Sequence, residues 1–242
     1  MKHKILITKV ILMALSIHGL SAATVVDFNA GVIHSNVYVN DSYPYTETNP
    51  ILSTAQRPDY TGPDIYGGFR SNGDSRLFAA GGVDDAGLRL RWNRGVGDAN
   101  ESISGLFLFK IADAGLIEFQ PGMDGITAQI GYMNPGATGP DLAVRDAEIR
   151  LVFKDNSGYY ISEAKAVNSG AGIYFNALSE SYRSYNPSLT SIEAINTIGD
   201  PAQPSFKGIA FAGFYLKAVR GSDLQSGTNI GVTQFTVRAR KN

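Results

Sequence analysis

The sequence predicts an all-β protein, an antiparallel β-sandwich of jelly-roll type. Three observations predict this fold class. Apolar and polar residues alternate with a period of two along several stretches, as in half-buried strands. Glycine is frequent, with 27 in a chain of 242 residues, and suits a fold with many turns. Helical periodicity is scarce, and only residues 188–195 and 177–182 are expected to form short helices.

The clearest strand patterns are at residues 87–93 and 147–153. In each of them every second residue is apolar, which predicts one face turned to the core. Residues 105–112 are apolar at both parities, a pattern typical of a central strand, and a hairpin turn is expected to follow at 113–115. The residues expected to face inward are Leu88, Leu90, Trp92, Ile149, Leu151 and Phe153. Further strands are expected at 116–120, 125–133, 158–162, 172–176, 207–218 and 229–239.

The last of these patterns changes parity. Ile230 and Val232 are two residues apart, but Phe235 and Val237 continue the apolar series on the opposite parity. One extra residue in the strand would restore the register. The sequence therefore predicts a β-bulge near Thr233 and Gln234.

A long irregular excursion is expected near residues 40–75. Its Asn40–Gly73 stretch holds four prolines and many Asn, Thr, Asp and Tyr residues, which favour loops over regular strands. No repeat or linker divides the chain. We therefore expect one β-sandwich domain over residues 24–242, within the size range of such domains.

Residues 1–23 have the pattern of a secretory signal peptide. Lys2, Lys4 and Lys9 precede an apolar run at 10–17, and small residues at 21–23 suit cleavage after Ala23. The run is shorter than the roughly 20 residues that a spanning helix needs, and no second such run follows. We expect a secreted or periplasmic protein with no membrane span after the signal is removed.

Composition excludes several kinds of chemistry. A net charge of −1 gives no basic stripe for nucleic acid. The absence of cysteine excludes disulfides and thiolate sites. Two of the three histidines, His3 and His18, leave with the signal, so a multi-histidine zinc site and a serine-histidine triad are not expected around His34 alone. We expect no catalytic or metal-binding residue and no cofactor, with a structural calcium left open at Asp84-Asp85 or at 98–101.

The polar side chains that alternate with the apolar ones along the predicted strands suggest a ligand-binding sheet face. Arginine, glutamine and glutamate side chains can hydrogen-bond neighbouring sugar hydroxyls, and arginine suits carboxylated or sulfated sugars. The alternative is a charged outer face held by cross-strand ion pairs. The candidate contacts on this face are Arg89, Arg91, Gln120, Glu148 and Arg150, and Gln129 is a further member.

Tyrosines in the loops suggest a rim for the same ligand. Tyr182 and Tyr185 stand before an Asn-Pro pair, and Tyr43 and Tyr45 lie in the excursion. A tyrosine ring offers an apolar face to a sugar and a hydroxyl to water. The alternative is that these rings anchor loops. If the protein is instead a polysaccharide-degrading enzyme, Glu118 and Glu148 or a tyrosine-arginine pair would carry its chemistry.

Several stretches resemble known secreted proteins. Residues 147–163, AEIRLVFKDNSGYYISE, resemble a strand-turn-strand feature of secreted bacterial β-sandwich proteins of unassigned function. Residues 208–215 and 227–237 are similar to the last two strands of carbohydrate-binding-module-like jelly rolls. Those modules often carry an aspartate as calcium ligand where this chain has Thr233-Gln234.

Jelly-roll polysaccharide lyases offer a second resemblance. Gln129-Ile130 resembles the start of their glutamine-isoleucine-histidine motif, but Gly131 stands where the catalytic histidine belongs. The leading hypothesis is therefore a secreted, non-enzymatic carbohydrate-binding protein whose partner is a polysaccharide. The alternatives are a polysaccharide-degrading enzyme, a lyase or a glycoside hydrolase, and a structural or surface-assembly protein without a small ligand.

Overall fold

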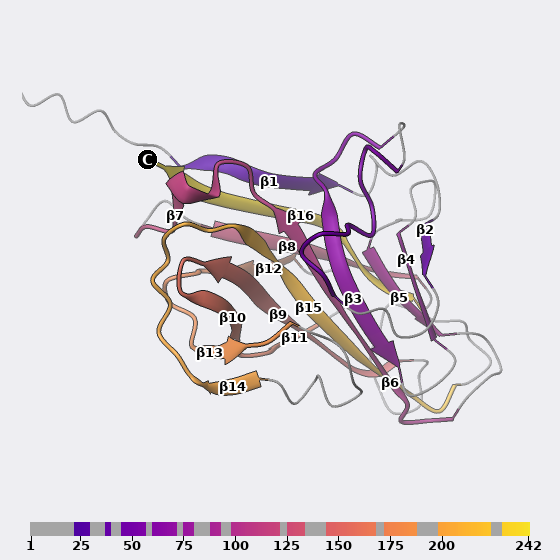
Figure 1. Cartoon of the computed structure of the whole chain (residues 1–242). Helices are drawn as coiled ribbons and strands as arrows, with labels where there is room; N and C mark the ends of the chain where they lie inside the picture. Colours follow the sequence, from indigo (N-terminus) through magenta and orange to yellow (C-terminus); the bar gives the residue numbers. More distant parts are fainter. Residues whose placement is uncertain are drawn as a thin grey trace, which may run out of the picture.

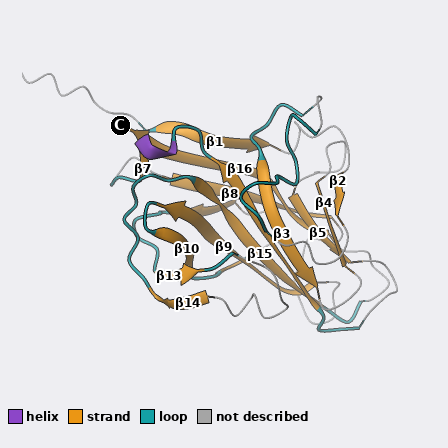
Figure 2. Ribbon diagram, in the orientation of Figure 1, coloured by secondary structure: helices purple, strands orange, loops and turns teal. Residues whose placement is uncertain are grey.

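The chain forms two antiparallel sheets that pack together as in a β-sandwich (Figures 1 and 2). This confirms the all-β class, while the jelly-roll connectivity stays a prediction. The computed structural model describes residues 22–29, 37–39, 45–56, 60–71, 75–79, 88–92, 98–121, 125–133, 144–167, 172–187, 198–223 and 229–242.

The first sheet has the order β12-β8-β16-β5-β4-β2, with β1 and β7 also paired to β16. The long C-terminal strand β16 lies at its centre and pairs with β8 along most of its length. The strands are β1 (Ala23–Asn29), β2 (Val37–Val39), β4 (Ser75–Ala79), β5 (Leu88–Trp92), β7 (Ile117–Glu118), β8 (Gly125–Met133), β12 (Gly172–Phe175) and β16 (Asn229–Lys241).

The second sheet has the order β14-β13-β10-β9-β15-β6-β3, with β11 also paired to β9. In Figure 1 the gold strand β15 lies between β9 and β6. The strands are β3 (Ile65–Ser71), β6 (Ser102–Lys110), β9 (Val144–Asp155), β10 (Gly158–Ser162), β11 (Lys165–Ala166), β13 (Tyr182–Tyr185), β14 (Ile198–Pro201) and β15 (Phe211–Arg220).

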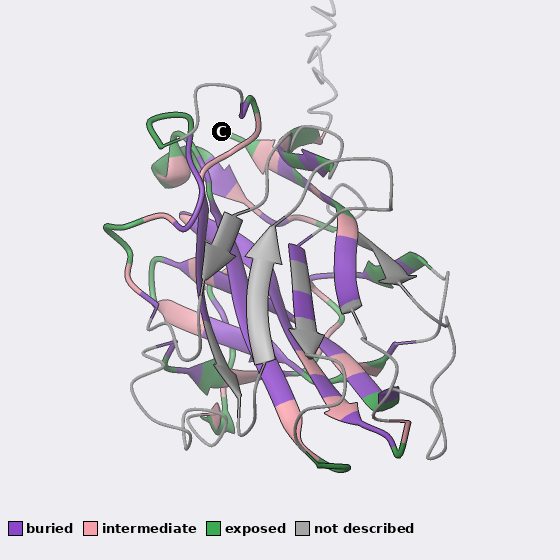
Figure 3. Cartoon of the chain, turned by 90° about the vertical axis from the view of Figure 1, so that its right-hand side faces the viewer, coloured by how far each residue is buried: buried purple, intermediate pink, exposed green. Residues whose placement is uncertain are grey.

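The main core contains apolar side chains from both sheets. Phe109 of β6 stacks on Phe235 of β16, with ring centroids 5.3 Å apart. Figure 3 shows buried residues along the strands and exposed ones mainly in loops. The inward positions predicted for β5 and β9 are confirmed where side chains are described, because the following residues are almost fully buried: Leu88, Leu90, Ile149, Leu151 and Phe153.

The predicted bulge in β16 is confirmed. The register against β8 shifts between Val232 and Gln234. The partner on the other side of β16 changes at the same place, from β5, which pairs up to Val232, to β1, which pairs from Gln234 onward. The extra residue at Thr233 therefore lies where β16 exchanges one neighbour for another.

The second sheet is apolar on both faces. A second cluster of buried residues lies apart from the main core and includes Leu106, Leu108, Val152, Ile161 and Tyr185. The neighbours of Leu106 and Leu108 along β6, Phe107 and Phe109, belong to the main core. This explains the apolar pattern of residues 105–112 and confirms their prediction as a central strand, since β6 lies between β15 and β3.

Some predicted elements are wrong. Residues 177–182 form a turn closed on the Asn176 carbonyl and not a helix, because Tyr182 begins strand β13 with its ring in the core. Residues 113–115 do not make a hairpin: a 3-10 turn (Ala114–Leu116) leads to β7, which pairs with β16 instead of β6. The excursion near 40–75 contains β3, which pairs with β6 over seven residues.

The signal peptide expected at residues 1–23 lies outside the described residues except for its last two positions, and the helix expected at 188–195 lies wholly outside them. Within the described part of the chain, no helix is long and apolar enough to cross a membrane.

Candidate functional site

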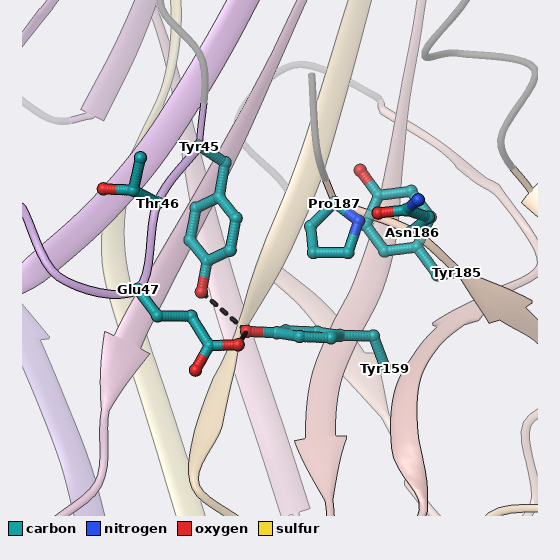
Figure 4. A pocket seen from close by; sticks show the side chains of 7 residues that line it. All are labelled: Tyr45, Thr46, Glu47, Tyr159, Tyr185, Asn186 and Pro187. Carbon is teal, nitrogen blue, oxygen red and sulfur yellow. Dashed lines mark hydrogen bonds between the residues drawn. The ribbon is translucent and has the colours of Figure 1, made fainter. Parts of the chain in front are cut away.

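A pocket of about 310 Å³ opens near one end of the second sheet (Figure 4). Three tyrosine rings contribute to its walls, together with one carboxylate, one amide and one proline ring. In Figure 4 the ring of Tyr159 is seen edge-on, and both Tyr45 and Pro187 lie above it. The residues that line it are Tyr45, Thr46, Glu47, Tyr159, Tyr185, Asn186 and Pro187.

Three separate parts of the chain form this pocket. Tyr159 is the second residue of β10, just after the turn that joins β9 to β10. Tyr185 is the last residue of β13, which pairs with β10. Tyr45 and Glu47 come from the excursion and reach the same place from more than 100 residues away in sequence. Only the folded sheet brings these groups together.

A chain of hydrogen bonds fixes the pocket wall. The Tyr159 hydroxyl donates to Oε1 of Glu47 over 2.7 Å. The Tyr45 and Tyr159 hydroxyl oxygens are 2.8 Å apart. Because the Tyr159 proton is directed to the carboxylate, Tyr45 is the donor of this second bond. The two rings meet edge to face, with an interplanar angle of 84°, so both ring planes are held in place.

Lys154 neutralises the pocket carboxylate. Its Nζ lies 2.7 Å from Oε1 and 2.9 Å from Oε2 of Glu47, and 5.1 Å from the centroid of the Tyr159 ring. Burial opposes ionisation of Glu47, but the hydrogen bonds from Lys154 and Tyr159 outweigh it and hold the pKa of Glu47 below its ordinary value of 4.5. Glu47 is therefore ionised at neutral pH.

The pocket tyrosines are neutral at the same pH. Burial raises the pKa of Tyr45, Tyr159 and Tyr185 above the ordinary value of 10.0. Tyr45 and Glu47 raise the pKa of Tyr159 further, and the nearby hydroxyls of Tyr215 and Tyr45 raise that of Tyr185 further. The pocket thus offers neutral hydroxyls, aromatic surface and one charge-compensated carboxylate.

The two tyrosines predicted at the rim have different positions. Tyr185 lines the pocket. Tyr182 does not: it is buried in the main core, edge-on to Phe153, and its hydroxyl donates to the Ala177 carbonyl over 2.5 Å. The expectation that Tyr182 is a rim contact is wrong, because the alternation of β13 turns Tyr182 to the opposite side of the sheet from Arg183 and Tyr185.

Glu148 and Arg150 take part in a network of ion pairs on the second sheet. Nε of Arg150 lies 3.3 Å from Glu148, and Glu163 lies 3.9 Å from Arg150 and 3.2 Å from Arg183. This arrangement matches the alternative of cross-strand ion pairs. Both arginines have carboxylate partners already.

The other predicted face residues lie elsewhere. Arg89 and Arg91 belong to β5 of the first sheet, and their side chains lie outside the described part of the structure, as does that of Gln129 on β8. Gln120 follows β7, where it donates to Glu118 and accepts a bond of 2.7 Å from Arg240. A single face containing all five predicted contacts does not form, because they are distributed over two sheets and a loop.

The predicted carboxylate pair is not brought together either. Glu118 lies on β7, 3.8 Å from Nη1 of Arg240, while Glu148 lies on β9 of the other sheet beside Arg150. The two strands are not neighbours in either sheet. Each carboxylate instead has its own arginine partner.

The hydrogen bonds and ion pairs at residues 98–101 do not favour the structural calcium site considered there. Asn100 accepts a hydrogen bond from Arg145, and Glu101 lies 3.9 Å from Arg220, so two of the oxygen donors face arginines. Among the described residues, no group of three or more acidic, histidine or cysteine side chains could hold a metal ion. Tyr43 and Asp84-Asp85 lie outside the described residues.

Sequence reasoning missed Glu47 and Tyr159 as members of the site. A signal for Tyr159 was present, since residues 158–162 carry aromatic or aliphatic side chains at both parities, which indicates a strand covered on both faces. Glu47 gave no such signal. It is one of several polar residues in a proline-rich stretch, and only tertiary contacts distinguish it.

A scan against models of known protein families finds no match for this chain, and a search of curated protein sequences finds none either.

Proposed function

We propose that this chain is a secreted, non-enzymatic carbohydrate-binding protein, and that the tyrosine pocket is its sugar site. The observation that carries this proposal is the pocket wall of Tyr45, Tyr159 and Glu47, joined by hydrogen bonds of 2.8 and 2.7 Å. Rings fixed in this way give a preformed surface, which lowers the entropy lost on binding.

The pocket chemistry suits a sugar. Aromatic faces pack against the C–H surface of a sugar ring, while carboxylate, amide and hydroxyl groups accept or donate hydrogen bonds to its hydroxyls. Tyr159 offers the first kind of contact, and Glu47 and the exposed Asn186 offer the second. The volume of about 310 Å³ is at the small end of ligand pockets, which span about 300–1,000 Å³.

The same groups favour binding over catalysis. Glycoside hydrolysis needs two carboxylates about 5–10 Å apart. Glu47 is the one carboxylate among the described lining residues, and its lowered pKa makes it a poor general acid. A lyase that uses a tyrosine base needs that tyrosine to ionise readily, whereas burial raises the pKa of each pocket tyrosine. These points favour a binding role over the polysaccharide-degrading alternative.

The proposal of export rests on residues 1–23, with their lysines, apolar run and small residues before the expected cleavage site. A bacterial periplasm or exterior suits a protein of this kind that contains no cysteine. Polysaccharide is the partner expected there.

The test is a glycan-array screen of the purified protein, with and without calcium, followed by calorimetry on the sugars that bind. Tyr159→Ala removes the ring and the donor to Glu47, and we expect it to abolish detectable binding. Tyr174→Ala is the matched control, because Tyr174 is a 55 % exposed tyrosine on β12 of the other sheet. It should bind like the unaltered protein.

Each outcome of the screen decides between the candidate functions. Binding without product release, lost only in Tyr159→Ala, supports the proposal. Turnover of a bound glycan supports the enzyme alternative. No binding to any neutral or acidic glycan would overturn the proposal in favour of a structural role.

A further inference from the structure

Tyr185 has a buried hydroxyl without a hydrogen-bond partner. The residue is only 7 % exposed, and its ring lines the tyrosine pocket. The hydroxyl oxygen is shielded from solvent and forms no hydrogen bond within the described part of the chain. Burying a hydroxyl in this way costs free energy that a phenylalanine at the same position would not.

Three other buried tyrosines of this protein have hydrogen-bond partners. Tyr60 donates to the Pro63 carbonyl and Tyr182 to the Ala177 carbonyl, each over 2.5 Å, and Tyr45 bonds to Tyr159. Tyr182 and Tyr185 stand at opposite ends of the same four-residue strand, β13. Two buried tyrosine hydroxyls, those of Tyr185 and Tyr215, lack a partner among the described residues, and of these two residues only Tyr185 lines the pocket.

We propose that the Tyr185 hydroxyl is a ligand-binding group, which takes its hydrogen bond from a hydroxyl of a neutral sugar when the ligand enters the pocket. This inference rests on the proposed function and names the class of ligand. The bound sugar supplies the missing partner, so the hydrogen bond is gained without breaking one within the protein. Because the oxygen is covered in the free protein, the Tyr185 ring must shift slightly as the ligand enters, while the hydrogen-bonded wall of Tyr45, Tyr159 and Glu47 stays in place.

The surroundings favour an uncharged sugar hydroxyl over an acidic group. The groups that act electrostatically on Tyr185 are the hydroxyls of Tyr215 and Tyr45, which are neutral at pH 7 because burial raises their pKa values, to about 12 for Tyr215. Two cations act on the pocket carboxylate Glu47: Lys154, which is paired with it, and Lys110, which acts through its charge alone. Arg150 and Arg183 on the same sheet are paired with glutamates. A carboxylated or sulfated sugar would have to compete with a glutamate for each of Lys154, Arg150 and Arg183.

The test compares Tyr185→Phe with Tyr182→Phe. Calorimetry uses neutral tetrasaccharides of glucose, xylose, mannose and galactose, with tetragalacturonate as the acidic probe, and urea unfolding measures stability. For Tyr185→Phe we expect an unchanged or higher unfolding midpoint, and an affinity for the neutral ligand lower by about 5- to 30-fold, as for loss of one buried hydrogen bond. Tyr182→Phe should do the opposite, with a lower midpoint and unchanged affinity.

The outcomes separate this inference from the proposed function. Undiminished affinity in Tyr185→Phe, or a lower unfolding midpoint, would overturn the inference, while loss of binding in Tyr159→Ala would still support the sugar site. Tighter binding of tetragalacturonate than of every neutral tetrasaccharide would overturn the neutral class. Failure of all probes to bind would overturn both.

Discussion

Asp155 holds the backbone of Phe206, 51 residues further along the chain, through a hydrogen bond of 2.9 Å from the Phe206 N–H to Oδ2. The same oxygen accepts two bonds from Ser205, and Oδ1 accepts three from Ser157 and Gly158 in the β9–β10 turn. One buried carboxylate therefore joins this turn to the loop before β15. The turn lies immediately before Tyr159, so Asp155 also helps to position the pocket.

Replacing Asp155 with Asn should destabilise the fold strongly. An amide has one acceptor oxygen, and its NH₂ group would face N–H and O–H donors. We expect the free energy of unfolding to fall by about 2–3 kcal/mol, as for loss of charge-assisted hydrogen bonds at a buried site. Urea unfolding measures the change. The control is Asp113→Asn, which removes an exposed ion pair with Lys241 and should change stability by less than about 1 kcal/mol.

The contribution of Asp155 should depend on pH. Burial opposes its ionisation, but the hydrogen bonds from Ser157, Ser205 and Phe206 outweigh burial and lower its pKa below the ordinary 3.8. A depressed folded-state pKa stabilises the fold at pH values above the unfolded pKa, and this stability is lost as pH falls through the folded value. The stability difference between the unaltered protein and Asp155→Asn should be largest near neutral pH and shrink below about pH 4. A constant difference down to the acid limit would contradict this assignment.

Gly213 should not tolerate a side chain. It lies in the middle of β15, where a Cβ atom would overlap the Phe107 carbonyl oxygen. Gly213→Ala must push β15 away from β6, and we expect a loss of more than about 3 kcal/mol or failure to fold. Gly115→Ala is the matched control, since nothing lies within 4 Å of its Cβ position. Circular dichroism and soluble yield of both variants test the difference.

Glu47→Gln should weaken sugar binding with little effect on stability. The ion pair with Lys154 is partly exposed, with 43 % of the Glu47 side chain accessible, so its loss should change the free energy of unfolding by less than about 1 kcal/mol. The affinity for a neutral glycan should fall about 5- to 10-fold. Tyr159 loses its charged hydrogen-bond acceptor, and the pocket wall that this bond orders becomes less rigid. Calorimetry and urea unfolding on the same sample check the two effects. A large loss of stability with unchanged affinity would assign Glu47 a structural role only.

Binding should persist under mildly acidic conditions and fail in stronger acid. Because the pKa of Glu47 lies below the ordinary glutamate value of 4.5, the carboxylate is still mostly ionised when the pH has fallen to 4.5. Protonation at still lower pH removes the acceptor for Tyr159 and the partner of Lys154. A titration of affinity between about pH 7 and pH 3 should therefore show an acidic limb that is absent in Glu47→Gln.

The local pattern of the sequence determined many of the strands and which of their faces turn inward. Alternation alone was sufficient for Leu88 and Leu90, and for the run from Ile149 to Phe153, because strand side chains point alternately to the two faces of a sheet. The change of parity after Val232 was enough to predict the bulge in β16. Such patterns can be read from residues only a few positions apart in the chain.

The turn at 177–182 and the short strand β7 show where local signals are insufficient. A short amphipathic stretch can form a helix or a turn, and the burial of Tyr182 in the core selects the turn and then a strand. The pairing of β7 with β16 instead of β6 is likewise a long-range contact.

The sequence by itself determined the all-β class and suggested Tyr185 and Tyr45 as tyrosines to consider. Only the tertiary structure decided that these two line one pocket with Tyr159 and Glu47, while Tyr182 lies in the core and the predicted arginines are distributed over two sheets. The physical reason is the difference in range. Alternation is a property of adjacent residues, whereas the pocket depends on which strands pair and on how the excursion folds over the sheet they form.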